Sequence, residues 1–143
     1  MSINIIDYGV CNASSVQNML TRIGYPCSIV SSPKEITSKN KLILPGIGSF
    51  DNGIKNLEKL SWIDYFKNDF DSNNQYLLGL CLGMQLLLDE SEEGELKGLG
   101  IIPGQVKKLY FDLNNKIPNI GWRNVKILNS NPIVKKLDKD DRF

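Results

Sequence analysis

The stretch of residues 76–88, which reads YLLGLCLGMQLLL, decides the fold that we expect for this chain. Its first half is a short apolar run, typical of a strand that is covered on both faces of a sheet. Its second half, residues 82–88, has the apolar content of a buried helix. Between them, residues 79–83 read GLCLG, the pattern of a nucleophile elbow with cysteine in place of serine. The sequence therefore predicts a sharp strand-to-helix turn that lifts Cys81 out of a sheet.

Short apolar runs alternate with helical patterns upstream of this stretch. Further strands are predicted at residues 3–6, 27–30 and 42–44, and the segments between them have helical periodicity or helix-start signals. Strands that alternate with helices form right-handed βαβ units. We therefore expect an α/β fold, a mostly parallel open sheet with flanking helices.

The rhythm changes after residue 88. Residues 101–102, 105–110 and 122–128 predict shorter, more polar strands separated by turns. We expect them to form short antiparallel strands in the C-terminal part, or to pack beside the main sheet. Because no linker or internal repeat is present, residues 1–143 are expected to form a single domain.

Composition excludes several classes of function. The net charge of +1 predicts no strong attraction to nucleic acid or to anionic membranes. No apolar run approaches the ~20 residues that span a bilayer, and the N-terminus has no signal-peptide pattern. Three cysteines without close spacing favour reduced thiols in a cytoplasm over a disulfide framework. Because the chain has no histidine and no CxxC motif, we expect no zinc site. We expect no other metal and no cofactor.

Cys81 is the candidate nucleophile. At a strand-to-helix turn its thiol lies at a helix N-terminus, where the helix dipole favours the thiolate. The backbone N–H of Leu82 is then available to stabilise an oxyanion. Alternatively, Cys81 is a small buried hydrophobic residue, as free cysteines most often are, and the glycines serve packing. The elbow pattern favours the nucleophile.

Other candidate binding segments follow the same strands. Residues 44–50, LPGIGSF, place two glycines at the carboxyl edge, where open α/β sheets bind ligands. The alternative is a plain strand-to-helix turn, and the spacing excludes a Walker A loop. Gln85 lies one turn after Cys81 and either binds a substrate amide or carboxylate, or faces solvent. The acidic run 89–94 either presents a carboxylate to a substrate ammonium group or is a solvated loop.

Taken together, these segments resemble class I glutamine amidotransferases and, within that family, the glutaminase subunit of imidazole glycerol phosphate synthase. The matching segments are residues 6–9 (IDYG), 44–50 (LPGIGSF), 79–87 (GLCLGMQLL), 90–94 (ESEEG) and 118–122 (PNIGW). The block CLGMQ is highly specific to the family, and its combination with DYG and GW narrows the resemblance to this subunit and its close relatives. The resemblance covers most of the chain, from residue 3 to about residue 125.

The resemblance implies a mechanism and a set of site residues. Cys81 attacks the side-chain amide of glutamine, ammonia leaves, and water hydrolyses the resulting glutamyl thioester to glutamate. The implied residues are Gly46, Ile47 and Leu82 for the oxyanion hole, and Gly48, Gln85 and Glu93 for substrate binding.

The resemblance also implies a partner. Ammonia passes to a (β/α)₈ barrel cyclase, the other half of a heterodimer, which uses it in histidine biosynthesis. The loop of residues 7–9 and the region of Gly121 and Trp122 are expected to lie toward this cyclase.

This sequence departs from the family pattern in three ways. The family activates its cysteine with a histidine backed by a glutamate, and this chain contains no histidine. We therefore expect the amidotransferase domain to lack its C-terminal part here, and residues 1–143 alone to have little or no glutaminase activity. Cys11 stands where the family usually has glycine, so we expect the conformation of this turn to differ from that of the family. Asn119 stands where histidine is common, which bears on coupling to the cyclase.

Other functions stay open on the sequence alone. A paralogue that supplies ammonia for the amidation of a surface sugar shares the same motifs, and Cys11 and Asn119 keep this alternative open. A non-catalytic module that regulates a synthase would not need Cys81. A cysteine hydrolase or peptidase with a similar sheet would show no preference for glutamine. We favour a glutaminase, and histidine biosynthesis over sugar amidation.

Overall fold

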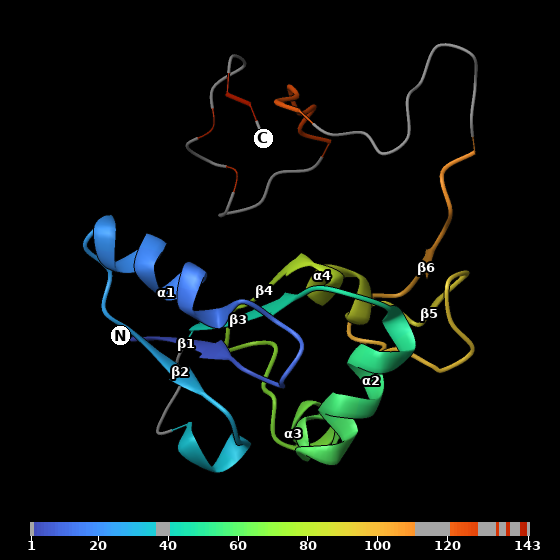
Figure 1. The fold of residues 1–143 in the computed structure, drawn as a ribbon, viewed down its shortest axis with the longest axis horizontal. Coiled ribbons are helices and arrows are strands. Elements are labelled where there is room, and N and C mark those ends of the chain that lie inside the picture. Colours follow the sequence, from blue (N-terminus) through green and yellow to red (C-terminus); the bar gives the residue numbers. More distant parts are fainter. Residues whose placement is uncertain are drawn as a thin grey trace. The chain divides into compact units, whose positions relative to one another are not determined.

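The computed structural model describes residues 2–36, 41–110, 121–128, 134, 137, 141 and 142. The chain divides into two compact units, Met1–Lys108 and Leu109–Phe143. The helices and strands labelled in Figure 1 belong to Met1–Lys108. This first unit carries Cys81 and the other candidate site residues.

A parallel sheet forms the centre of the first unit. Its strands are β1 (Ile3–Ile6), β2 (Cys27–Val30), β3 (Lys41–Gly46) and β4 (Leu77–Cys81). They pair in parallel in the order β2-β1-β3-β4. The α/β fold predicted from the sequence is therefore confirmed. Because parallel strands share a carboxyl edge, the ends of β3 and β4 meet, and Gly46 pairs with Cys81.

Helices cover both faces of this sheet (Figure 1). They are α1 (Ala13–Arg22), the short 3₁₀ helix η1 (Pro33–Glu35), α2 (Phe50–Lys59), α3 (Trp62–Asn68) and α4 (Leu82–Leu86). Asn12 caps α1, since its side chain accepts the N–H of Ser15 at 3.2 Å. Ser61, in a left-handed conformation with φ of 61°, separates α2 from α3.

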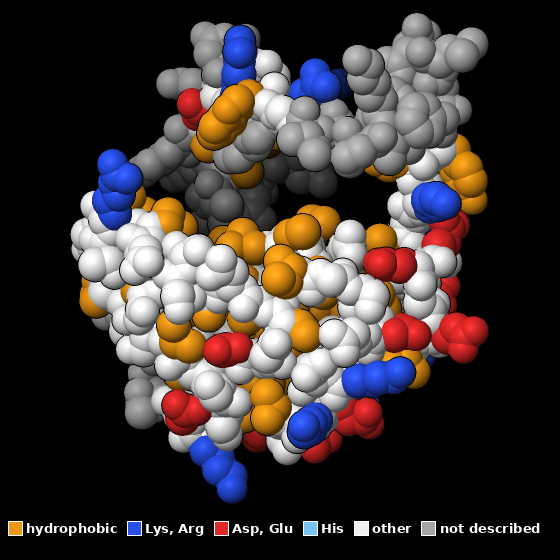
Figure 2. Space-filling view, in the orientation of Figure 1, with side chains coloured by type: hydrophobic (Ala, Val, Ile, Leu, Met, Phe, Trp, Pro, Cys, Tyr) orange, Lys and Arg blue, Asp and Glu red, His pale blue; other side chains and the backbone are white. Residues whose placement is uncertain are grey.

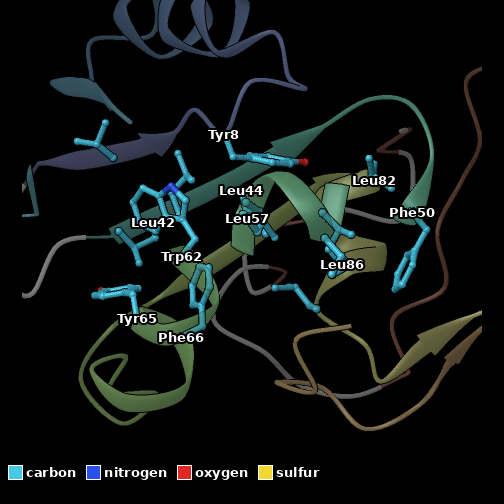
Figure 3. Close-up of a cluster of buried hydrophobic side chains, with 14 residues drawn as sticks. Tyr8, Leu42, Leu44, Phe50, Leu57, Trp62, Tyr65, Phe66, Leu82 and Leu86 are labelled. Carbon is cyan, nitrogen blue, oxygen red and sulfur yellow. The ribbon is translucent and has the colours of Figure 1, made fainter. Parts of the chain in front are cut away.

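The core has a layer on each face of the sheet, as the alternation of side chains along the strands requires. Ile5 and Ile43 point to one face and pack with Ala13 and Leu20 of α1. Leu42 and Leu44 point to the other face. There they join a larger cluster from α2, α3 and α4, in which Leu57, Trp62, Phe66 and Leu86 are prominent (Figure 3).

Helix α4 is shorter than the predicted 82–88 because the following chain folds back onto its end. The carbonyl of Leu86 accepts the N–H of Leu99 at 2.9 Å, and the carbonyl of Leu88 accepts that of Gly100 at 3.2 Å. The carbonyl of Leu87 accepts the N–H groups of Ile101 and Ile102, at 2.9 and 3.0 Å. These bonds satisfy carbonyls that a helix end leaves without intrahelical partners. Residues 101–102 therefore cap α4 and are not the predicted strand.

A second, short sheet pairs β5 (Glu90–Ser91) with β6 (Gln105–Val106). The pairing is parallel, so the antiparallel arrangement expected for residues 105–106 was wrong. A tight hairpin would make neighbouring strands antiparallel. Here the long connection of residues 92–104 returns the chain in the same direction. Among the residues that the structure describes in the second unit, Asn124 and Arg142 form an antiparallel bridge.

The connection after β5 is tied to α2 by one carboxylate. Asp51, in the first turn of α2, accepts the N–H of Glu95 at 3.0 Å and that of Leu96 at 3.1 Å. These backbone hydrogen bonds, from Leu96 and then Glu95, hold the pKa of Asp51 below its ordinary value. The connection that carries Glu93 is thus fixed to a helix of the main core.

Replacing Asp51 by alanine is expected to lower the unfolding temperature at pH 7 by a few degrees, because Glu95 and Leu96 lose their acceptor. The folded-state pKa lies below the unfolded value, so this stabilisation exists above the unfolded pKa and disappears as pH falls through the folded pKa. Circular dichroism melts at pH 7 and at about pH 2 measure both effects. Asp64→Ala, at an exposed acid in the first turn of α3, is the control. A difference between parent and Asp51→Ala that persisted at low pH would contradict this role.

Candidate active site

Cys81 ends β4 in a backbone conformation that non-glycine residues rarely adopt. Its φ is 54° and its ψ is −118°, immediately before the first residue of α4. Holding a side chain in such a conformation costs about 1–3 kcal/mol, and such strain clusters at functional sites. The thiol is free and the residue is exposed. The structure therefore shows the sharp strand-to-helix turn that the sequence predicts, with Cys81 at its tip.

Glycines make this turn possible because backbones approach closely around it. A Cβ atom at Gly83 would collide with the carbonyl oxygen of Leu44, on the neighbouring strand β3. A Cβ atom at Gly79 would lie 2.7 Å from the backbone nitrogen of Met84, closer than real contacts allow. The requirement for small residues on both sides of Cys81 is confirmed.

The three cysteines differ in their surroundings. The thiol of Cys11 is half-buried and donates to the carbonyl of Ile6 at 3.6 Å. Burial, and then the Asp7 carboxylate, raise the pKa of Cys11 to about 11, so it keeps its proton at neutral pH. The thiol of Cys27 donates to the carbonyl of Gln17 at 3.8 Å. Of these thiols, Cys81 is the one exposed to a reagent or a substrate.

The loop after β3 lies beside Cys81. Gly46 pairs with Cys81 in the sheet, and Ile47 and Gly48 follow on the surface. Gly48 has a φ of 91°, which suits glycine. The N–H of Ile47 donates to the carbonyl of Val10 at 3.0 Å. An oxyanion beside Cys81 could therefore receive this N–H only after the bond to Val10 is released.

Gln85 and Glu93 line one cavity. Its volume is about 390 Å³, and its walls also include Ser91, Glu92, Val106, Lys107 and Lys108. The structure thus brings together two of the residues that the sequence assigned to substrate binding. Cys81 does not line this cavity among the residues that the structure describes. It lies at the start of α4, one helical turn before Gln85.

The acidic run resolves into carboxylates with separate roles. The carboxylate of Asp89 accepts the N–H of Gly104 at 2.8 Å, and that of Glu90 accepts the Nζ of Lys97 at 2.6 Å. The carboxylate of Glu92 accepts the N–H of Lys108 at 2.8 Å. These three carboxylates stabilise the connection and the second sheet; Glu92 and Glu93 both line the cavity. Figure 2 shows acidic side chains gathered over the part of the first unit that carries β5.

Sequence reasoning missed two groups of residues near the site. Lys107 and Lys108 line the cavity because β6 pairs with β5, and no local pattern indicated that pairing. Tyr8 was expected in a loop directed at a partner, but its side chain is fully buried. Its neighbour Gly9 is exposed.

The predicted partner-facing residues near position 121 lie outside the unit that carries Cys81. Gly121 and Trp122 belong to the second unit, where the side chain of Trp122 is 77% exposed. Residues 118–120, which include Asn119, lie outside the described residues. Among the helices that the structure describes, none is long and apolar enough to cross a membrane.

Comparison with known proteins gives both a family and relatives. The family model for class-I glutamine amidotransferases matches residues 4–140. The chain is 44% identical to imidazole glycerol phosphate synthase subunit HisH 2 of Methanococcus maripaludis, over 99% of this chain and 70% of the relative.

Two further relatives carry the same subunit name. The chain is 40% identical to subunit HisH of Synechococcus sp. over 96% of this chain and 64% of the relative. It is also 40% identical to subunit HisH 1 of Campylobacter jejuni over 99% of this chain and 71% of the relative. The chain thus spans roughly two thirds of the length of these relatives. A family match over nearly the whole chain, together with the elbow at Cys81, shows that this protein belongs to the class-I glutamine amidotransferases.

Proposed function

We propose that this chain is the glutaminase part of an imidazole glycerol phosphate synthase, which releases ammonia from glutamine for histidine biosynthesis. The observation that carries the proposal is the strained, exposed Cys81 one helical turn before Gln85, which shares a cavity with Glu93. The relatives named as subunits of this synthase support the choice within the family.

The reaction begins at the thiolate of Cys81. A bond forms between its sulfur and the side-chain carbonyl carbon of glutamine, and the carbon–nitrogen bond then breaks. The nitrogen takes a proton and leaves as ammonia, and water hydrolyses the glutamyl thioester to release glutamate. The N–H of Leu82 and the loop of Gly46 and Ile47 stabilise the negative charge on the carbonyl oxygen. The N–H of Ile47 joins them once it leaves the carbonyl of Val10.

The other end of glutamine is held away from the sulfur. The carboxylate of Glu93 suits the α-ammonium group of glutamine, because opposite charges form strong hydrogen bonds. The amide of Gln85 and the backbone at Gly48 suit the α-carboxylate, since both offer N–H donors. The cavity that Gln85 and Glu93 share supports this assignment.

In the family's mechanism a histidine takes the thiol proton, and the 143 residues contain no histidine. Cys11 keeps its proton at neutral pH and the side chain of Tyr8 is buried, so neither of these two residues replaces the histidine as a base. Residues 1–143 supply the nucleophile, the oxyanion donors and the glutamine-binding groups.

A synthase subunit receives the ammonia. We propose a (β/α)₈ barrel cyclase as the second half of a heterodimer, since the relatives are named as subunits of one synthase. We propose a cytoplasmic location, which suits three free cysteines.

The full-length gene product, assembled with its cyclase, is expected to gain one adduct from a glutamine-analogue diazoketone. The adduct forms on Cys81 because this thiol is exposed and lies one helical turn before Gln85, which lines the proposed glutamine-binding cavity. Intact-protein and peptide mass spectrometry measure it.

Two variants make this labelling specific. Cys81→Ala is expected to abolish the adduct, and Cys27→Ala, at a half-buried thiol that bonds the carbonyl of Gln17, is expected to keep it. Labelling that survives in Cys81→Ala would exclude this nucleophile. Transfer of the released ammonia to a surface sugar, which would be amidated, instead of to the imidazole product would exclude histidine biosynthesis.

Replacing Glu93 by glutamine is expected to raise the KM for glutamine about tenfold or more and to change kcat less, since an interaction with the substrate ammonium group is lost. Steady-state kinetics of glutamate release measure both constants. Synthase turnover with free ammonia as the nitrogen source is expected to stay unchanged. Glu95→Gln, at an exposed residue of the same connection, is the matched control. A parental KM in Glu93→Gln would remove Glu93 from the substrate site.

A further inference from the structure

The hydroxyl of Tyr8 is a buried polar group that the reaction described above does not use. The side chain of Tyr8 is fully buried in the core on the α2 face of the sheet (Figure 3). Its oxygen has no hydrogen-bond partner among the described residues. Leaving such a group unpaired costs roughly 1–3 kcal/mol, so a phenylalanine would serve the core better.

This hydroxyl lies directly against the backbone of the active-site turn. A Cβ atom at Gly46 would collide with the Tyr8 oxygen, and would lie 2.8 Å from the nitrogen of Gly83 and 3.0 Å from the Cβ of Leu82. Gly46 is also the residue that pairs with Cys81. Figure 3 shows the oxygen of Tyr8 on the side of its ring that faces Leu82. The hydroxyl is therefore packed between the loop after β3 and the start of α4.

The neighbouring peptide group offers an acceptor. The N–H of Ile47 now points to the carbonyl of Val10, two residues after Tyr8. Because a peptide group is planar and trans, turning this N–H toward Cys81 turns the carbonyl oxygen of Gly46 to the opposite side. That side carries the Val10 carbonyl, and the Tyr8 hydroxyl lies close to Gly46 itself. Glycine at position 46 tolerates the required change of backbone angles.

We propose that Tyr8 is a positioning residue, whose hydroxyl donates a hydrogen bond to the Gly46 carbonyl when the Ile47 N–H faces the substrate. The bond would stabilise the oxyanion-binding arrangement relative to the arrangement held by Val10. Burial, and then the nearby Cys11 and Cys81, raise the pKa of Tyr8 well above its ordinary range. The group therefore remains a protonated donor throughout the neutral range. This role rests on the glutaminase function proposed above.

The test is Tyr8→Phe in the full-length gene product assembled with its cyclase. This variant keeps the ring in the core and removes only the hydroxyl. We expect kcat for glutamine hydrolysis to fall about tenfold with little change in KM, because the lost bond acts on the oxyanion arrangement. We expect the unfolding temperature to stay the same or to rise, because an unpaired buried group is removed.

Tyr65→Phe is the matched control within the same core cluster. The hydroxyl of Tyr65 is paired with the amide of Gln75, at 3.1 and 3.3 Å, on α3 and away from the turn. Its removal is expected to lower the unfolding temperature and to leave kcat unchanged. Tyr8→Phe should thus lower kcat without lowering stability, and Tyr65→Phe should lower stability without lowering kcat. A purely structural role for Tyr8 would not produce this difference.

The outcomes separate this inference from the function on which it rests. If the parent hydrolyses glutamine and Tyr8→Phe has the parental kcat, the positioning role is overturned and the glutaminase function stands. If Tyr8→Phe loses stability and activity together, the hydroxyl serves the fold and the positioning role is again overturned. If Cys81 of the parent is not labelled by the glutamine-analogue diazoketone, the glutaminase function falls, and the positioning role falls with it.

Discussion

The position of Cys81, the candidate nucleophile, depends on the close approach of two backbones, the end of β3 and the first turn of α4. Gly83 lies so near the carbonyl of Leu44 that no side chain fits between them. This contact fixes where α4 begins relative to the sheet, and the chain must turn sharply at Cys81 to meet it. The strain at Cys81 is therefore maintained by packing of the main core. A thiol on a relaxed surface loop would also be exposed, but it would not have this fixed position.

The cavity lined by Gln85 and Glu93 depends on a second set of backbone interactions, at the other end of α4. Carbonyls that the short helix leaves unpaired accept N–H groups from residues 99–102, which brings β6 back beside β5. Asp51 fixes the same connection to α2. Through these bonds Glu93 comes to line the same cavity as Gln85. One five-residue helix thus connects Cys81, the candidate nucleophile at its start, to Gln85, a candidate binding residue near its end.

The two buried hydroxyl groups in the main core illustrate how stability and function diverge. Tyr65 has a partner in Gln75, as buried polar groups generally do. Tyr8 has none among the described residues and lies against the turn that precedes Ile47. The free-energy cost of leaving the Tyr8 hydroxyl unpaired is tolerated if another backbone arrangement gives this hydroxyl a hydrogen-bond partner. The bond from Ile47 to Val10 shows that the turn has a competing partner in the present arrangement.

The sequence by itself determined the parallel sheet, the elbow at Cys81 and the glycines around it, because period, apolar runs and turn chemistry are local. Only the tertiary structure decided that β5 and β6 run parallel, that α4 ends at Leu86, and that Tyr8 is buried beneath Gly46. It also showed that Asp89, Glu90 and Glu92 accept hydrogen bonds within the connection and the second sheet, although the acidic residues look alike in the sequence. The physical reason is that these features come from hydrogen bonds and steric contacts between segments distant along the chain. Such contacts leave no period in the sequence from which to predict them.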